Sequence, residues 1–129
     1  TVGGAAQDLT VTTNAGSGFT VSIKTSSSTP NPLRDGAGHT VADVTGTNAS
    51  PGAAPVAGTS GFGYTSSDTS TSFTSNKWAK LTSTSSPVLL SLTGPASKTA
   101  CVGFEATVAS TDAAGAYSAT VIYTTVPTF

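Results

Sequence analysis

Charge is the scarcest property of this sequence. Five lysines and arginines and six aspartates and glutamates occur among 129 residues, which gives a net charge of -1. Charged residues make up 9% of the chain, whereas about a quarter is usual in globular proteins. The composition therefore gives no electrostatic basis for binding nucleic acid or an anionic membrane. Solubility must depend on hydroxyl groups, because about a third of the residues are serine or threonine. Such a surface has little charge repulsion to keep copies apart, which favours self-association.

Cysteine, methionine and long apolar runs are also absent or nearly so. Cys101 is the only cysteine and there is no methionine, so no disulfide can form within the chain. A lone cysteine at the start of a strand is expected to be a small buried hydrophobe, with pairing to another chain as the alternative. No run approaches the roughly 18 apolar residues of a membrane span, so no span is expected. This composition resembles that of extracellular surface proteins and predicts an extracellular, cell-surface location.

The clearest pattern present is the stretch DAAGAYSATVIYTTVP, at 112–127. From Tyr117 onward its residues alternate strictly between two faces and are rich in aromatic and β-branched types, which predicts a central strand of a sandwich. Asp112 and Gly115 supply a turn before it, in the arrangement of a tyrosine corner, where the phenol of Tyr117 reaches main chain upstream. An ordinary turn followed by a core tyrosine is the alternative.

Shorter alternating segments lie along the rest of the chain. Segments 8–13 and 19–24 flank a turn cluster at 14–18 and predict a hairpin. A second hairpin is expected between 101–108 and 117–124. Further strands are expected at 39–44, 62–64 and 88–93, the last of them buried on both faces.

Together these segments predict one domain over 1–129. It is expected to be an all-β, mainly antiparallel β-sandwich of seven to eight strands, immunoglobulin-like or jelly-roll-like. Trp78, with Phe73 and Leu81, is expected to cap one end of the core. The inward faces of the strands predict a core made of Leu9, Val11, Phe19, Val21, Ile23, Leu90, Val102, Phe104, Tyr117, Val121 and Tyr123.

Catalytic chemistry has few residues to use. His39 is the only histidine, so a histidine-dependent hydrolase would need it together with a serine or Cys101 as nucleophile. No GxSxG motif occurs, because GTSGFG at 58–63 misses the spacing. The loop DGAGHTVAD at 35–43 offers carboxylates and an imidazole, but it falls short of a calcium loop and is predicted to be a glycine turn. We therefore expect a protein that is not an enzyme and has no catalytic residue, metal or cofactor, with the His39 hydrolase as an alternative.

Two kinds of glycan contact follow from the sequence. Asn48-Ala49-Ser50 matches the triplet for N-glycosylation, although Pro51 follows it directly. A carbohydrate- or cell-wall-binding module is the other alternative function, and it requires an exposed cluster of Trp78, Tyr64 and Tyr123. In that case cell-wall glycan would be a partner.

The segments LTVTTNAGSGFTVSI and AGAYSATVIYTTVP, near the two ends, resemble the paired signatures of bacterial cell-surface β-sandwich domains, including WxL-like cell-wall domains. The last strand of those domains ends in a Tyr-x-Ala-Thr run followed by Pro. The WxL tripeptide itself is absent, since Ala79, Lys80 and Leu81 follow Trp78, so no binding residue is transferred. The resemblance implies an exported, non-enzymatic surface or appendage protein.

Domains of that kind usually have a further strand before the LTVTT segment, where this chain has only TVGGAAQ and Asp8. Either the sequence lacks a segment of a larger surface protein, or another chain supplies a strand by β-augmentation. We expect a subunit of a surface fibre, pilus or surface layer, whose partners are copies of itself or neighbouring surface proteins. The TVGGAAQ arm is expected to extend into a neighbour's sheet.

Overall fold

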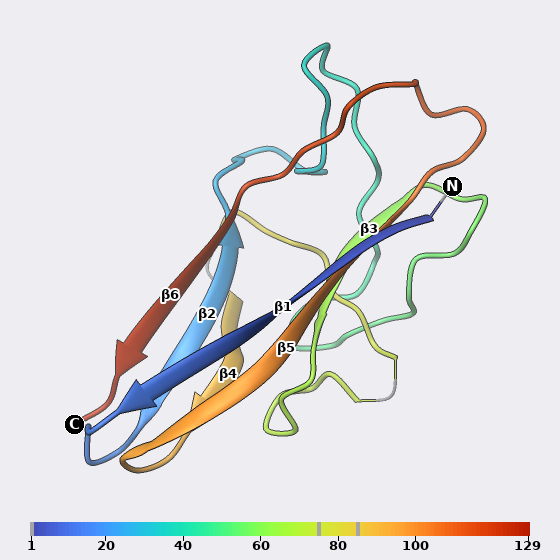
Figure 1. Cartoon of the computed structure of the whole chain (residues 1–129). Coiled ribbons are helices and arrows are strands. Elements are labelled where there is room, and N and C mark those ends of the chain that lie inside the picture. The colour runs from blue at the N-terminus through green and yellow to red at the C-terminus, as the bar shows by residue number, and fades with distance from the viewer. Residues whose placement is uncertain (1, 75, 85) are drawn as a thin grey trace.

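The structure is a computed structural model, and it describes residues 2–74, 76–84 and 86–129, with side chains left out at 86–89. The described part contains no helix, and it has no helix that could cross a membrane. Six strands are present in it, instead of the seven to eight predicted (Figure 1). They are β1 (Val2–Thr13), β2 (Phe19–Thr25), β3 (Gly61–Ser66), β4 (Ser86–Leu92), β5 (Ala96–Thr107) and β6 (Val121–Pro127).

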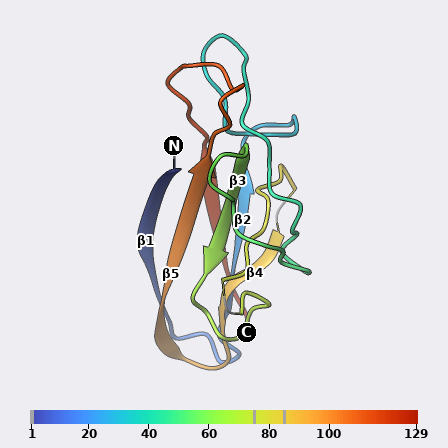
Figure 2. The same ribbon diagram turned by 90° about the vertical axis from the view of Figure 1, so that its right-hand side faces the viewer.

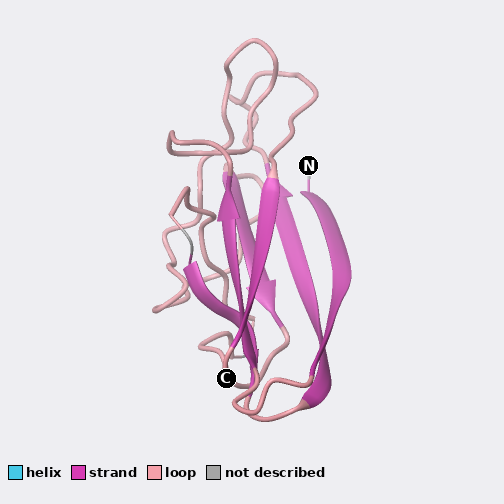
Figure 3. Cartoon of the chain, turned by 90° about the vertical axis from the view of Figure 1, so that its left-hand side faces the viewer, coloured by secondary structure: helices cyan, strands magenta, loops and turns pink. Residues whose placement is uncertain are grey.

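The strands form two antiparallel sheets of three, in the orders β1-β5-β3 and β4-β2-β6. Odd-numbered strands make one sheet and even-numbered strands make the other, so every connection crosses between the sheets. Figure 2 shows the two layers edge-on, and Figure 3 shows that long loops gather beyond one end of the strands. The prediction of an all-β, antiparallel fold is confirmed.

Both predicted hairpins are wrong, because the strands that they join lie in different sheets. β1 pairs with β5 along its whole length, whereas β2 pairs with β4 and β6. The turn at 14–18 is real, and Gly18 has φ +87° with an added Cβ only 1.8 Å from the Leu92 carbonyl oxygen. The turn leads the chain into the opposite sheet. The sequence did not show this, because alternation fixes which face of a strand is buried but not which strand lies beside it.

Two other strand predictions also need correction. Segment 39–44 makes only isolated bridges, Thr40 with Arg34 and Asp43 with Phe62, because its main chain is divided between two partners. The final strand begins at Val121 rather than Tyr117, and β6 is an edge strand rather than a central one. Of the 88–93 strand, the side chains at 88 and 89 lie outside the described residues, and Leu90 is fully buried.

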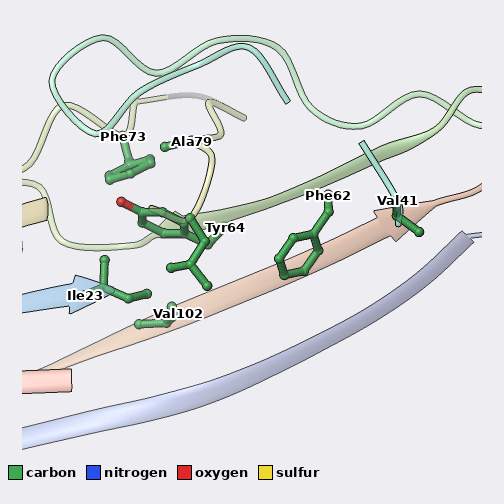
Figure 4. Packing of buried hydrophobic residues seen from close by; sticks show 8 residues of the cluster. Ile23, Val41, Phe62, Tyr64, Phe73, Ala79 and Val102 are labelled. Carbon is green, nitrogen blue, oxygen red and sulfur yellow. The ribbon is translucent and has the colours of Figure 1, made fainter. Parts of the chain in front are cut away.

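The core is built in two adjoining clusters shared by both sheets. All eleven predicted core residues belong to them, either fully buried or half-buried and packed against buried neighbours. Figure 4 shows the larger cluster, in which the Tyr64 and Phe73 rings lie together between the layers with Ile23 and Val102. Phe73, Trp78 and Leu81 are all buried, as the predicted cap requires. Because the core fills the space between the sheets, the outer strands of each sheet are where main-chain groups can be open to other molecules.

Candidate interaction surface

Four strands stand at sheet edges: β1, β3, β4 and β6. Among them they carry a single charged residue, Asp8 of β1. Edge strands expose unpaired N–H and C=O groups, and proteins normally protect them with charge, proline, bulges or a covering segment. Charge protects none of the other three edges here. What covers each edge differs from strand to strand.

Loop segments cover the outer edge of β3. The Phe62 N–H donates to the Ala42 carbonyl at 2.8 Å, and the Val44 N–H donates to the Phe62 carbonyl at 2.9 Å. Two residues along, Tyr64 and Ala79 exchange both of their main-chain hydrogen bonds at 2.9 Å. The segment 42–44, which was predicted as a strand, thus acts as part of this cover.

A buried ion pair covers the outer edge of β4 at Ser91. The Asp68 carboxylate accepts from the Ser91 N–H at 2.9 Å, and the Lys98 ammonium donates to the Ser91 carbonyl at 2.7 Å. Lys98 Nζ lies 2.5 Å from Asp68 Oδ1, and the Asp68 side chain has no exposed area. Burial alone would raise the pKa of Asp68, but the Lys98 ammonium and the hydrogen bonds from Ser70 and Ser91 outweigh it and lower that pKa.

β1 and β6 have no such cover. Within the described residues, the outer edges of both strands form no main-chain hydrogen bond. The two edges lie on the same side of the sandwich, where β1 starts at the N-terminus and β6 ends near the C-terminus (Figure 3). A side-chain hydrogen bond links them, from the Gln7 amide to the Tyr123 hydroxyl. Burial raises the pKa of Tyr123, and the bond from Gln7 partly offsets that rise.

An apolar groove lies between these two uncovered edges. It consists of two adjoining cavities of about 400 Å³ and about 450 Å³, which share five lining residues. The shared residues are Ala5, Leu33, Phe62, Phe104 and Tyr117. Phe62 also belongs to the larger core cluster, so the floor of the groove is continuous with the core. We call this surface the β1–β6 margin: the outer edges of β1 and β6 and the groove between them.

The residues predicted to contact a glycan are not available to do so. Tyr64 is 0% exposed and Trp78 is 8% exposed. The Trp78 ring lies beside Gly103, where the missing side chain leaves it room, and its N–H donates to Asn76 at 3.1 Å. Tyr123 is half-buried at the margin. The three rings therefore form no exposed platform, because packing in the core uses two of them.

Asn48, the predicted glycosylation site, has a structural partner. Its side-chain nitrogen, the atom to which a glycan would be attached, donates to the Tyr64 hydroxyl at 3.0 Å. Asn48 is half-buried within a turn closed by hydrogen bonds between Thr47 and Ser50. This contact connects the loop to the most deeply buried ring of the core.

His39 belongs to a self-contained loop. Its Nδ1 lies 2.7 Å from Asp35 Oδ2, and the Asp35 carboxylate also accepts from the N–H groups of Ala37 and His39. The hydrogen bond from His39 lowers the pKa of Asp35. In the described part of the chain, the ring bonds to Asp35 and has no hydrogen bond to a hydroxyl or to the Cys101 thiol. Asp43 instead pairs with Asn31, and no set of metal-ligating side chains is found among the described residues.

The predicted tyrosine corner is present. The Tyr117 hydroxyl donates to the Ala113 carbonyl at 2.8 Å. Burial, with the negative charges of Asp35 and Asp112, raises the pKa of Tyr117. The ring thereby holds the 112–118 turn against the groove, of which it forms one wall.

Cys101 is half-buried in β5, with a free thiol. Its main-chain N–H donates to the Ser67 hydroxyl at 2.9 Å and not to β1.

Comparison with known proteins adds no function to this geometry: no family model, curated protein or solved structure matches the chain.

Proposed function

We propose that this chain is a non-enzymatic, extracellular structural protein that associates with copies of itself through the β1–β6 margin. One observation carries the proposal. Two edges of the sandwich are covered by loops and an ion pair, whereas the two edges that remain open flank a single apolar groove. A surface fibre, pilus or surface layer is the kind of assembly that such a subunit would form.

The chemistry of the margin favours an extended partner segment. A strand laid along β1 or β6 would satisfy the open main-chain groups, as in β-augmentation. Its apolar side chains would cover the groove, at roughly 25 cal/mol for each Å² of apolar area removed from water. With Asp8 as the one charge on the two strands, little repulsion opposes the approach of a second copy.

A jelly-roll-like variant of the sandwich fits the topology better than an immunoglobulin-like one. In the immunoglobulin arrangement several consecutive strands share a sheet. Here each connection crosses between the sheets, which is the habit of double-sheet jelly rolls. The extracellular location is supported by the hydroxyl-rich, weakly charged composition and by the resemblance of the two end segments to cell-surface domains.

Edge lysines test the proposal. Ala6→Lys on β1 and Thr125→Lys on β6 place a charge on exposed positions of the open edges. Thr69→Lys is the matched control, because Thr69 is exposed in the loop on the opposite side. Sedimentation velocity over a concentration series should show assembly of the unchanged chain and of Thr69→Lys, and loss of assembly in both edge variants. A chain that stays monomeric at every concentration would overturn the proposal and favour an isolated module.

A further inference from the structure

The first seven residues of β1 are attached to the protein almost entirely through main chain. Residues 2–8 are all exposed, and Val2 keeps 53% of its accessible area. From Leu9 onward alternate residues become half-buried, and Leu9 packs against both core clusters. One strand therefore has two parts, a peripheral part at 2–8 and an anchored part at 9–13.

The peripheral part covers the groove poorly. Gly3, Gly4 and Ala5 line the cavity of about 400 Å³ beneath it, and their small side chains fill little of that space. What holds the segment is the ladder to β5, which runs from Val2 opposite Thr107 to Asp8 opposite Cys101, together with the side-chain hydrogen bond from Gln7 to Tyr123. Segments with few buried apolar contacts open at a low free energy compared with the core.

We propose that residues 2–8 are an exchangeable strand, which leaves β5 of its own copy and pairs with residues 101–107 of a second copy. This inference rests on the proposed self-association and names the segment of the second copy that takes part in it. The same segment of a second copy can form the same seven pairs in the same register, so exchange loses no ladder hydrogen bond. Seven extended residues span about 23 Å, which is the length of ladder that the exchange would transfer to the second copy.

The pair of Asp8 and Cys101 offers a direct test. The main-chain N–H and C=O of Cys101 both bond to Ser67, on the side of the strand away from β1. Asp8 and Cys101 are therefore a non-hydrogen-bonded pair, for which the Cα atoms lie about 4.5 Å apart. A disulfide accepts that distance. Asp8→Cys should consequently form a disulfide with the native Cys101, within one copy or between two.

Asp8→Cys is oxidised as a monomer and, separately, after assembly, and both samples are run on non-reducing gels. Exchange predicts cross-linked dimers or ladders from the assembled sample. It also predicts that the monomer locked by its own disulfide does not assemble until a reductant is added. The double variant Asp8→Cys, Cys101→Ser is the control and should assemble without any cross-link.

A second pair keeps the test independent of Cys101. Gly4 lies opposite Glu105, and like Asp8 and Cys101 these two residues form a non-hydrogen-bonded pair. The variant Gly4→Cys with Glu105→Cys, made in a Cys101→Ser chain, therefore tests the middle of the segment. An assembled sample that contains only cross-links within single chains, for both pairs, would overturn the exchange and leave the proposed self-association standing. A chain that forms no assembled species at all would overturn both.

Discussion

The two sides of this sandwich differ in how their edge strands are protected. On the β3–β4 side, both edges have outward partners: Phe62 and Tyr64 of β3 bond to loop main chain, and Ser91 of β4 bonds to Asp68 and Lys98. On the β1–β6 side, the edges are joined by a contact between the Gln7 and Tyr123 side chains and stay open over a groove. The edge strands of the β3–β4 side carry no charged residue and those of the β1–β6 side carry only Asp8, so charges on the edge strands do not account for the difference.

The length of the connecting loops accounts for the difference in edge protection instead. The connections at 26–60 and 67–85 are long, and they supply Ala42, Val44, Asp68 and Ala79 to the β3–β4 side. The β1–β6 side receives Leu33 and the 117–119 stretch as groove walls, which leave the main-chain edges open. A sheet without charged edges can thus be protected by covering loops, and here the edges that the loops do not reach stay open.

The largest expected effect is on the closed side. Tyr64→Ala should lower the free energy of unfolding by about 4 kcal/mol, because it removes a fully buried ring that packs against Phe73 and Phe104. Tyr123→Ala makes the same change in a half-buried ring of the open side and should lower it by about 2 kcal/mol. Urea denaturation of both variants measures the difference. Equal losses would mean that the open side is as well packed as the closed one.

Removing the ion pair beside β4 should cause the second-largest loss of stability. Lys98→Met should lower the free energy of unfolding by about 3 kcal/mol at pH 7, because it leaves the buried Asp68 carboxylate without its cation. Lys24→Met is the matched control, since Lys24 lies on the other central strand and has no ion pair in the described part of the chain.

The pH dependence of this loss has a definite sign. The folded protein holds the pKa of Asp68 below its usual value, so the stabilisation is present above about pH 4 and is lost as the pH falls through the lowered pKa. The deficit of Lys98→Met relative to the unchanged chain should therefore shrink between pH 7 and pH 3. A deficit that is constant with pH would show that Lys98 acts by packing alone.

The sequence was sufficient for the faces of the strands but not for their neighbours. Leu9, Phe19 and Val102 each lie in the core as predicted, because alternation reports which face is apolar. Pairing depends on contacts far apart in the chain, such as Val2 with Thr107, and no local pattern encodes them. The turn at 14–18 was predicted correctly, and it was the expected return into the same sheet that was wrong.

The candidate interaction surface was predictable in kind but not in place. The shortage of charge on the edges can be counted along the sequence, and it led to an expected strand partner. In the single chain described, the TVGGAAQ arm pairs with β5 of its own copy as part of β1. Which edges stay open depends on where the loops at 42–44 and 79 settle, and only the structure places them. The burial of Trp78 and Tyr64 could not be predicted either, because an aromatic residue gives the same local sequence pattern whether its side chain is buried or exposed.

Substitutions at the groove itself should change stability least. Ala5 faces the cavity beneath β1, whereas Ala6 belongs to the opposite face of the same strand and does not line it. Ala5→Val adds two methyl groups to a partly empty apolar space, which should raise the free energy of unfolding by about 1 kcal/mol. Ala6→Val has the same strand propensity but no space to fill, so it should change stability by less than about 0.5 kcal/mol. If residues 2–8 exchange between copies, the better-anchored strand of Ala5→Val should also leave β5 more slowly, and sedimentation should show slower assembly than for Ala6→Val. Equal stabilities would mean that the cavity is already filled by relaxation of Leu33 and Phe104 around it, and that small side chains are not what makes the open side weak.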